Sequence, residues 1–459
     1  MLQQGMRDVR DACDVCDVRR MVWCHQWSSP RKFAPTGAIT PARSSSSHHA
    51  LLLRLILCAF LLLGAHTAHA AAAALAPPTP TKCDMSVGEW RYSKSYPRYV
   101  TCPYVRSIFN CRGNGRKDQL YEKQRWVPDK CSLPRFSAKA FLAMMRGKTV
   151  GFVGDSLMSN MWESFVCLLY ASGVNLKLVQ KRYGGYRYVG FYIPTSNTTI
   201  VYRFSAYLMQ AVTNSTKTAS GRGKHGYNVD LDVIDPALMG GVANMNVVVL
   251  TSGTWWQANV PGRAQSNVYR IKGQQVYLKD LNAHKYSLDV LRNYLGQFSS
   301  RLLPYFISLS PSHKWDQSYA SKPGVCGSDH PLTPTAAATI LGNSTTTLDY
   351  VSAQRAAFSS PNPVRFIDVT AISTARPDGH TGVWGVLGGG GTLADGEADD
   401  TKSSSTTMPG ASNGTAVGKP RTTTQSQPDC RHWCLPGVPD SWVDVTAAVW
   451  QREPSLLRK

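Results

Sequence analysis

Apolar runs of strand length alternate with stretches of helical periodicity from residue 141 onward. Four bounded apolar runs predict buried strands over 149–153, 246–250, 304–309 and 365–369. Apolar residues that recur at helical spacing predict helices over 156–170, 287–301 and 444–451. Buried strands separated by helices indicate an α/β domain with a mainly parallel sheet and helices on both faces.

Two stretches depart from this alternation. Aromatic residues alternate with other residues over 183–207, which predicts a β-hairpin added to the sheet. Residues 388–428 are rich in Gly, Ser and Thr and predict a flexible loop inserted in the domain, because closure entropy grows only slowly with loop length. We therefore expect one α/β domain over 137–459 that carries this low-complexity loop.

The N-terminal part differs in composition from the rest of the chain. Residues 1–50 are polar and irregular, and we expect a disordered cytosolic tail there. The apolar stretch 51–76 predicts either an uncleaved signal anchor or a signal peptide that is cleaved at Ala68-His69-Ala70. Residues 77–82 form a short proline-rich linker. Either outcome delivers the remainder of the chain to the secretory lumen.

Two independent features support a lumenal location. Four N-glycosylation sequons follow the apolar stretch, at Asn197, Asn214, Asn343 and Asn413. An even number of cysteines also follows it, which predicts up to four disulfides in an oxidising compartment. These eight residues are Cys83, Cys102, Cys111, Cys131, Cys167, Cys326, Cys430 and Cys434. Free buried thiols are the alternative, and the spacing does not choose the pairing.

Residues 83–136 are dense in cysteines, aromatic residues and turn residues. A segment this short builds no core of its own without covalent support. We therefore expect a disulfide-tied cap on the α/β domain. Arg125 and Trp126 are candidates for a sugar groove, since guanidinium groups and aromatic faces suit carbohydrate, with packing against the domain as the alternative for Trp126.

The net charge favours some partners over others. The formal net charge is +21, and residues 1–81 hold eight Arg and Lys against four Asp, so +17 belongs to the remainder. A charge of that size favours polyanionic partners such as nucleic acid, an anionic membrane or an acidic polysaccharide. No zinc-finger spacing, RNA-recognition signature or lysine-rich tail accompanies it, so we expect no nucleic acid partner.

The first candidate for chemistry is Ser156, which follows Gly154-Asp155 between the strand predicted over 149–153 and the helix predicted over 156–170. A serine on such a turn lies beside the unpaired N–H groups that open a helix. Those groups and the helix dipole stabilise a developing oxyanion, which suits acyl transfer. Ordinary turn and N-cap chemistry is the alternative for Gly-Asp-Ser.

The second candidate lies directly after the low-complexity loop. Asp429 and His432 are three residues apart, so a single turn can present a carboxylate and an imidazole together. Asp429 would then hold the imidazole tautomer while His432 removes the Ser156 proton. Cys430 and Cys434 are the covalent anchors available to hold this segment, with Cys111 and Cys326 as candidate partners. A surface turn with one solvated histidine is the alternative.

These motifs together resemble the plant trichome-birefringence-like family of cell-wall polysaccharide O-acetyltransferases, which are relatives of the SGNH/GDSL esterases. The resemblance rests on Gly154-Asp155-Ser156 and on the segment 429–437, and it covers about 83–450. The block 83–136 is similar to the family's N-terminal domain, including Asn114-Gly115-Arg116 and Leu133-Pro134-Arg135-Phe136. The family implies a three-layer SGNH-like fold, with Ser156 as nucleophile, His432 as general base and Asp429 as its orienting partner.

The resemblance also implies further site residues. Analogy with SGNH enzymes suggests an oxyanion hole made by the Ser156 N–H, Gly253 and Asn160. Residues 252–256 and 376–380 align with two further family motifs. They suggest substrate-binding residues, namely Trp255, Trp256, Asp378 and His380. This chain departs from the family pattern at three places: Thr254 replaces a histidine, Thr381-Gly382 replaces Pro-Ser, and Val443 replaces an asparagine. The departures leave the triad intact and concern the acceptor groove and the donor site.

The resemblance implies a Golgi-membrane O-acetyltransferase, single-pass type II, with a lumenal catalytic domain. An acetyl donor, acetyl-CoA or an acetylated intermediate, would acylate Ser156, and a polysaccharide hydroxyl would collect the acetyl group. No bound cofactor or metal is expected. Xylan is the favoured acceptor because uronic acid groups suit the positive charge, with pectin or mannan as alternatives. A secreted carbohydrate acetylesterase and a non-catalytic polysaccharide-binding protein are the other two hypotheses.

Overall fold

The computed structural model describes residues 83–183, 185–216, 224–257, 267–313, 326–359, 363–385, 428–453 and 455. The predicted tail, apolar stretch and linker lie outside these residues, as does all but the last residue of the low-complexity loop. Within the described part, no helix is long and apolar enough to cross a membrane.

A seven-stranded sheet in the order β13-β12-β9-β3-β6-β5-β4 forms the centre of the described unit. Its parallel strands are β3 (Thr149–Gly154), β6 (Thr198–Phe204), β9 (Val247–Thr251), β12 (Leu303–Ile307) and β13 (Arg365–Ile367). At one edge, β5 (Tyr186–Ile193) and β4 (Lys177–Tyr183) continue the sheet in antiparallel pairing. The four predicted strands are β3, β9, β12 and β13, and the mainly parallel sheet is confirmed.

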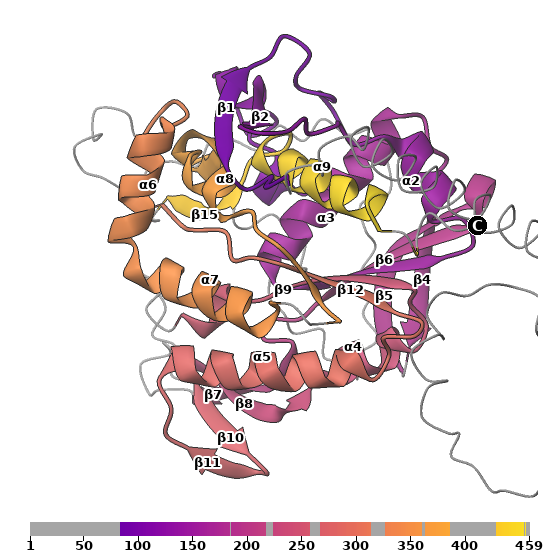
Figure 1. Cartoon of the computed structure of the whole chain (residues 1–459), viewed down its shortest axis with the longest axis vertical. Coiled ribbons are helices and arrows are strands. Elements are labelled where there is room, and N and C mark those ends of the chain that lie inside the picture. Colours follow the sequence, from indigo (N-terminus) through magenta and orange to yellow (C-terminus); the bar gives the residue numbers. More distant parts are fainter. Residues whose placement is uncertain are drawn as a thin grey trace, which may run out of the picture. The chain divides into compact units, whose positions relative to one another are not determined.

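Helices cover both faces of this sheet, as predicted (Figure 1). One face carries α3 (Ser156–Ala171), α9 (Val438–Gln451), α2 (Ala138–Met144) and α8 (Thr370–Thr374). The other carries α4 (Pro236–Val242), α5 (Asp280–Gly296) and α7 (Thr345–Ala357), and α6 (Pro334–Asn343) precedes α7. The core is continuous, because α3 buries thirteen of its sixteen residues between the sheet and α9.

Two of the predicted helices have wrong boundaries. The helix predicted over 287–301 is α5, which begins seven residues earlier, because the polar-looking first turns bury Ala283 and His284. The helix predicted over 444–451 begins at Val438, where Pro439 occupies the first turn. Proline is tolerated at that position because its missing N–H would have no partner within the helix.

The hairpin predicted over 183–207 is part of the main sheet rather than an addition to it. β5 and β6 do pair in antiparallel register, but β6 also pairs with β3. The aromatic strands therefore continue the central sheet. A second sheet in the order β11-β10-β8-β7 was not predicted. Its strands are β7 (Met209–Thr216), β8 (Lys224–Ile234), β10 (Val268–Ile271) and β11 (Gln274–Val276).

The cysteine-rich segment is a small two-stranded cap that is tied to the α/β domain. Its strands β1 (Gly88–Tyr92) and β2 (Gln124–Pro128) pair in antiparallel register. All eight predicted cysteines are paired, as Cys83–Cys131, Cys102–Cys167, Cys111–Cys434 and Cys326–Cys430. Only the first of these bridges lies within the cap. The second ties the cap to α3, and the third ties it to the segment that follows the loop.

Candidate active site

The site begins where the central strand β3 ends. Gly154 is its last residue, and a Cβ there would lie 2.5 Å from the carbonyl oxygen of Thr251, so the close approach of β3 and β9 requires glycine. Asp155 caps α3, because its Oδ1 accepts a hydrogen bond from the Leu157 N–H at 3.0 Å. Ser156 is therefore the first residue of α3, at the carboxyl edge of the sheet.

A chain of two hydrogen bonds links Ser156 to the segment after the loop. Ser156 Oγ lies 2.7 Å from His432 Nε2, and His432 Nδ1 lies 2.7 Å from Asp429 Oδ2. The other oxygen of Asp429 accepts the N–H groups of Arg431 and His432, at 3.0 and 3.1 Å. This is the geometry of a nucleophile, a general base and an orienting carboxylate.

The electrostatics keep Asp429 ionised. Burial alone would raise the pKa of this carboxyl group, but the adjacent His432 and the hydrogen bonds that it accepts outweigh burial and lower the pKa well below its usual range. A charged Asp429 fixes the proton on His432 Nδ1 and leaves Nε2 free to accept the Ser156 proton. It also stabilises the imidazolium that forms when the proton moves.

Asn160 anchors the segment that carries the base, and its part in the oxyanion hole stays a prediction. It lies on α3, fully buried, one turn beyond Ser156. Its Oδ1 accepts the Trp433 N–H at 2.8 Å and its Nδ2 donates to the Trp433 carbonyl at 3.0 Å. Both polar atoms of the amide are thus engaged with the residue after His432.

A short antiparallel pair completes the support of the base. β15 (Asp429–Trp433) pairs with β14 (His380–Gly382). Thr381, one of the departures from the family pattern, donates its hydroxyl to the carbonyl of Asp429 at 3.3 Å. The bridges Cys326–Cys430 and Cys111–Cys434 hold the two ends of the segment.

Asp378 and His380 were predicted to bind substrate, and the structure contradicts this. Asp378 is buried and forms a two-point ion pair with the fully buried Arg376, at 2.8 and 2.9 Å. His380 is 2% exposed, stacks on Trp433 with ring centroids 3.8 Å apart, and contacts the His432 carbonyl through Nδ1 at 3.0 Å. His380 therefore supports the segment that carries the base, whereas the carboxylate of Asp378 is engaged by Arg376.

Of the four other predicted substrate residues, three make contacts within the protein and one remains a candidate. Trp256 is fully buried with its indole N–H on Ser252, so it is a core residue. Trp126 is 2% exposed, and its indole N–H donates to the Met85 carbonyl. Arg125 donates to the carbonyl of Leu133 within the cap. Trp255 is half-buried, at the carboxyl end of β9 beside Phe204, and it remains the aromatic candidate for substrate.

Two backbone groups remain candidates for the oxyanion hole. The Ser156 N–H opens α3, where no helical carbonyl is available to accept it. Gly253 lies two residues beyond β9, the neighbour of β3, and its φ of +154° favours glycine. A Cβ there would also come within 3.0 Å of Leu309. Because β3 and β9 end side by side, both N–H groups belong to one edge of the sheet.

Our sequence analysis missed the residues that brace the site from the cap. Arg106 contacts Ser159 and Glu163 on α3, and its guanidinium lies 5.0 Å from the ring centre of Phe109. Phe109 in turn packs against His432, with ring centroids 5.7 Å apart. The one local signal was the position of Phe109 two residues before Cys111, which pairs with Cys434.

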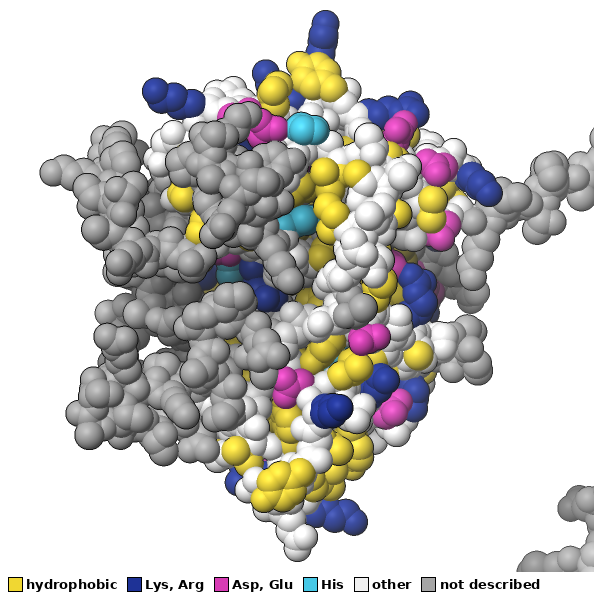
Figure 2. Space-filling view, turned by 90° about the vertical axis from the view of Figure 1, so that its left-hand side faces the viewer, with side chains coloured by type: hydrophobic (Ala, Val, Ile, Leu, Met, Phe, Trp, Pro, Cys, Tyr) yellow, Lys and Arg dark blue, Asp and Glu magenta, His cyan; other side chains and the backbone are white. Residues whose placement is uncertain are grey.

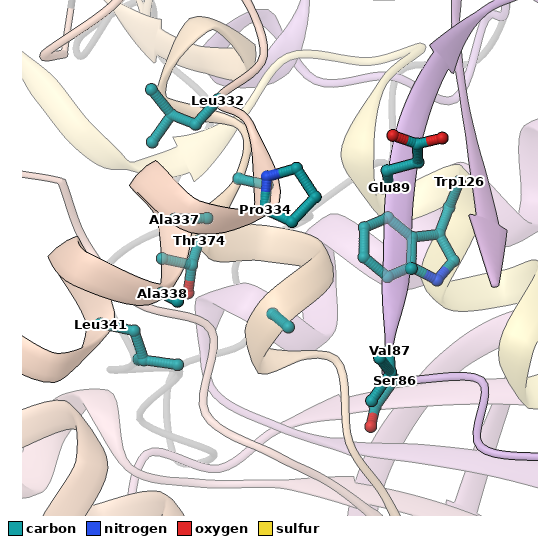
Figure 3. A pocket seen from close by; sticks show the side chains of 13 residues that line it. Ser86, Val87, Glu89, Trp126, Leu332, Pro334, Ala337, Ala338, Leu341 and Thr374 are labelled. Carbon is teal, nitrogen blue, oxygen red and sulfur yellow. The ribbon is translucent and has the colours of Figure 1, made fainter. Parts of the chain in front are cut away.

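A cavity of about 190 Å³ lies elsewhere, between β1 and the helices α6 and α8. Trp126, Leu332, Pro334 and Thr374 line it, together with other small and apolar side chains (Figure 3). None of the three residues of the catalytic chain contributes to its wall. The cavity is apolar and therefore does not suit a sugar hydroxyl.

The three-layer α/β fold, with a hydrogen-bonded chain that has the geometry of a serine triad, is typical of one class of protein, the acyl-transfer enzymes. The chain belongs to the GDSL/SGNH-like acyl-esterase family found in Pmr5 and Cas1p, whose model matches residues 133–449. The model of the PMR5 N-terminal domain matches residues 81–132, which contain most of the cysteine-rich cap.

Plant proteins of the same family align over most of the chain. Protein trichome birefringence-like 43 of Arabidopsis thaliana is 28% identical over 433 residues, which are 90% of this chain and 96% of that protein. Protein trichome birefringence-like 4 of Arabidopsis thaliana is 30% identical over 78% of this chain and 73% of its own length. Xylan O-acetyltransferase 2 of Oryza sativa subsp. japonica is 29% identical over 82% of this chain and 71% of its own.

Proposed function

We propose that this chain is a polysaccharide O-acetyltransferase that works through an acetyl-enzyme on Ser156. The observation that carries the proposal is the contact of 2.7 Å between Ser156 Oγ and His432 Nε2, with Asp429 behind the imidazole. The family, and a relative that is named as a xylan O-acetyltransferase, support acetyl as the group transferred.

The proposed reaction has two displacements. In the first, His432 Nε2 takes the Ser156 proton, Oγ bonds to the acetyl carbon, and the leaving group of the donor departs with that proton. In the second, His432 takes the proton of a sugar hydroxyl, the sugar oxygen bonds to the acetyl carbon, and Ser156 Oγ leaves and recovers a proton. Backbone N–H groups at the sheet edge stabilise both oxyanions.

The favoured acceptor is a xylan that carries uronic acid groups. Edge strand β4 presents exposed basic side chains at Lys177, Lys181 and Arg182. Strand β4 is third from β3 and points the same way, so Arg182 ends at the same edge of the sheet as Ser156. Neighbouring strands lie about 4.8 Å apart, so the backbones of Arg182 and Ser156 lie about 14 Å from one another. That distance is a few sugar units along a polysaccharide chain. Figure 2 shows a different face, where acidic and basic side chains lie next to one another in several places.

The donor and the compartment are part of the proposal. We take acetyl-CoA or an acetylated intermediate as donor, and a Golgi membrane location with the catalytic domain in the lumen, or secretion if the apolar stretch is cleaved. The four disulfides support an oxidising compartment.

Purified protein, incubated with an acetyl donor and a panel of deacetylated xylan, pectin and mannan, tests the proposal. We expect ester-linked acetyl on xylan and less on mannan, and none with Ser156→Ala. Acetate release from acetylated xylan, with no acetyl gained by any polymer, would instead identify an esterase. Polymer binding without either reaction would identify a binding protein.

A further inference from the structure

Two buried histidines connect the catalytic base to α8 through a line of three short contacts. His313 Nε2 lies 2.8 Å from the carbonyl oxygen of Thr374, the last residue of α8. His313 Nδ1 lies 2.7 Å from His380 Nε2. His380 Nδ1 lies 3.0 Å from the carbonyl oxygen of His432. The two histidines are 8% and 2% exposed, so the protein must supply all their hydrogen-bond partners.

These contacts need more protons than two neutral rings carry. A carbonyl oxygen only accepts, so the outer nitrogens, His313 Nε2 and His380 Nδ1, must each hold a hydrogen. The inner contact of 2.7 Å between His313 Nδ1 and His380 Nε2 needs one hydrogen between its two nitrogens. That makes three protons, whereas two neutral imidazoles hold two.

We propose that His313 and His380 share a third proton as a buried monocation, and that this proton positions His432 and makes the catalytic site sensitive to pH. His313 and His380 are positioning residues, because they act on the base through its main chain. The structural part of this inference is independent of the reaction. Its effect on rate rests on the proposed function.

A neutral pair cannot keep all three contacts. If the inner hydrogen is absent, two lone pairs face each other at 2.7 Å. If the hydrogen on His380 Nδ1 is absent, a lone pair faces the His432 carbonyl. Because an unmade hydrogen bond in a buried site costs about 1–3 kcal/mol, one contact opens when the third proton leaves. If instead the hydrogen on His313 Nε2 is absent, a lone pair faces the Thr374 carbonyl and the contact of His380 with His432 is kept. Two of the three contacts at risk thus involve His380, which stacks on Trp433 next to the base.

Charged groups around the pair act in both directions. Asp378 and Asp429 favour the cation, and the face of the Trp433 ring adds a cation–π contribution. Two arginines oppose the cation: Arg116 donates to the carbonyls of His380 and Asp378, and Arg376 neutralises Asp378. His432 opposes it when protonated. Burial lowers the pKa of both histidines. The third proton is therefore bound on the acidic side and lost as pH rises.

The substitution His313→Asn tests the proton count directly. An asparagine N–H lies near the position of the imidazole Nδ1 and can donate to His380 Nε2. Neutral His380 then donates from Nδ1 to the His432 carbonyl, and no third proton is needed. The exposed His330, which lies beside Asp329, supplies the matched control His330→Asn.

Nitrogen NMR of the full chain, labelled with ¹⁵N-histidine, counts the ring protons at each pH. We expect His313 and His380 to titrate together as one site, which His313→Asn abolishes and His330→Asn leaves unchanged. In parallel, kcat/KM of the wild type should fall on the alkaline side of the pair's own titration, because burial lowers the pKa of both histidines below the usual range. His313→Asn should remove that alkaline fall.

Two results would overturn the inference. One is a pair that holds two protons at every pH at which the protein is folded. The other is a His313→Asn enzyme that keeps the wild-type alkaline fall. If no substrate is turned over, the proposed function fails, and the ring-proton count still decides whether the pair is a cation.

Discussion

The chemistry of single residues here depends on what lies behind them. In the proposed mechanism, His432 Nε2 activates Ser156 Oγ, which lies 2.7 Å away, and Asp429 orients His432 through its other nitrogen. Asp429 stays ionised although it is buried, since the adjacent His432 and the hydrogen bonds from two main-chain N–H groups outweigh the desolvation. Each residue is thus held in the state that the next one requires.

Ser156→Ala should lower the rate of acetyl transfer by at least about 10³-fold, because the nucleophile is lost while oxyanion stabilisation remains. The unfolding temperature should stay at the wild-type value, since only one hydroxyl is removed. Ser172→Ala, at the other end of α3, is the matched control and should retain full activity, because the Ser172 hydroxyl only caps the Leu168 carbonyl. A Ser156→Ala enzyme with most of its activity would refute the serine mechanism.

Asp440 offers a prediction about stability and pH. It is buried at the start of α9, accepts the hydroxyls of Tyr99 and Ser164, and burial raises its pKa to about 6. The folded state therefore binds a proton between about pH 4 and 6 that the unfolded state does not, so this group makes stability fall as pH rises through that window. Above pH 6 the charged form costs about 3 kcal/mol.

Asp440→Asn removes that charge and keeps an oxygen for both hydroxyls. The variant should gain free energy of unfolding relative to the wild type as pH rises from 4 to 6, in urea titrations at each pH. The Asp444→Asn variant should instead lose roughly 3–5 kcal/mol of its free energy of unfolding, because Arg98 loses its buried partner at 2.7 Å. An Asp440→Asn protein whose difference from the wild type is the same at pH 4 and pH 7 would contradict the assignment.

At the scale of elements, β15 is a short strand held from several sides. It follows the low-complexity loop and carries both Asp429 and His432. The α3 residue Asn160, the strand β14 and two disulfides hold it in place. A displacement of about 1 Å at the base can cost on the order of a hundredfold in rate.

We therefore expect Cys430→Ser and Cys434→Ser to lower activity far more than deletion of part of the loop between Ser403 and Thr424. Each substitution breaks a bridge to Cys326 or Cys111, respectively, that fixes one end of the base segment. The control is Cys83→Ser with Cys131→Ser, which opens a bridge within the cap. Free thiols at Cys430 and Cys434 in fully active enzyme would refute this, and so would a loop deletion that is more damaging than either cysteine change.

Elements with a local signal were predictable, and those defined by distant contacts were not. The strand, turn and helix around Ser156 form within 23 residues, from Thr149 to Ala171, so periodicity and turn chemistry define them. The sheet formed by β7, β8, β10 and β11 joins strands up to sixty residues apart, and its parallel β8–β10 pair has no turn signal between its strands. His284 shows the same limit, because its polarity hid a buried helical turn.

The candidate site divides along the same line. Residue type and spacing made Ser156, Asp429 and His432 candidates, and the family resemblance favoured them over ordinary turn chemistry. Burial has no such local signature, and so Asp378, His380 and Asn160 were predicted to serve the substrate or the oxyanion. In the structure, Asn160 and His380 bond to the main chain at Trp433 and His432, and Asp378 pairs with Arg376. Only the packing distinguishes a supporting polar residue from one that contacts substrate.

At the scale of the whole molecule, the sequons test the lumenal location. Asn197 and Asn343 are exposed, at the ends of the turn 194–196 and of α6. Asn214 lies in β7, and Asn413 lies outside the described residues.

The protein made in plant cells should shrink on enzymatic deglycosylation. Asn197→Gln and Asn343→Gln should each remove one glycan, as measured by gel mobility and intact mass. Asn244→Gln, an exposed asparagine outside any sequon, is the control and should change nothing. A product without glycans that fractionates with cytosolic proteins would end the case for the secretory lumen.

The central claim is that an acetyl group passes through Ser156, and one measurement addresses it most directly. Purified protein is mixed with an acetyl donor, quenched with acid within seconds, and mapped by peptide mass spectrometry. We predict an acetyl group on the peptide that contains Ser156, absent in Ser156→Ala, and lost from the wild type when deacetylated xylan is added before the quench, with the acetyl group recovered on the polymer. Acetylated xylan formed at the same rate by Ser156→Ala, with no acetyl-Ser156 at any time, would contradict the account.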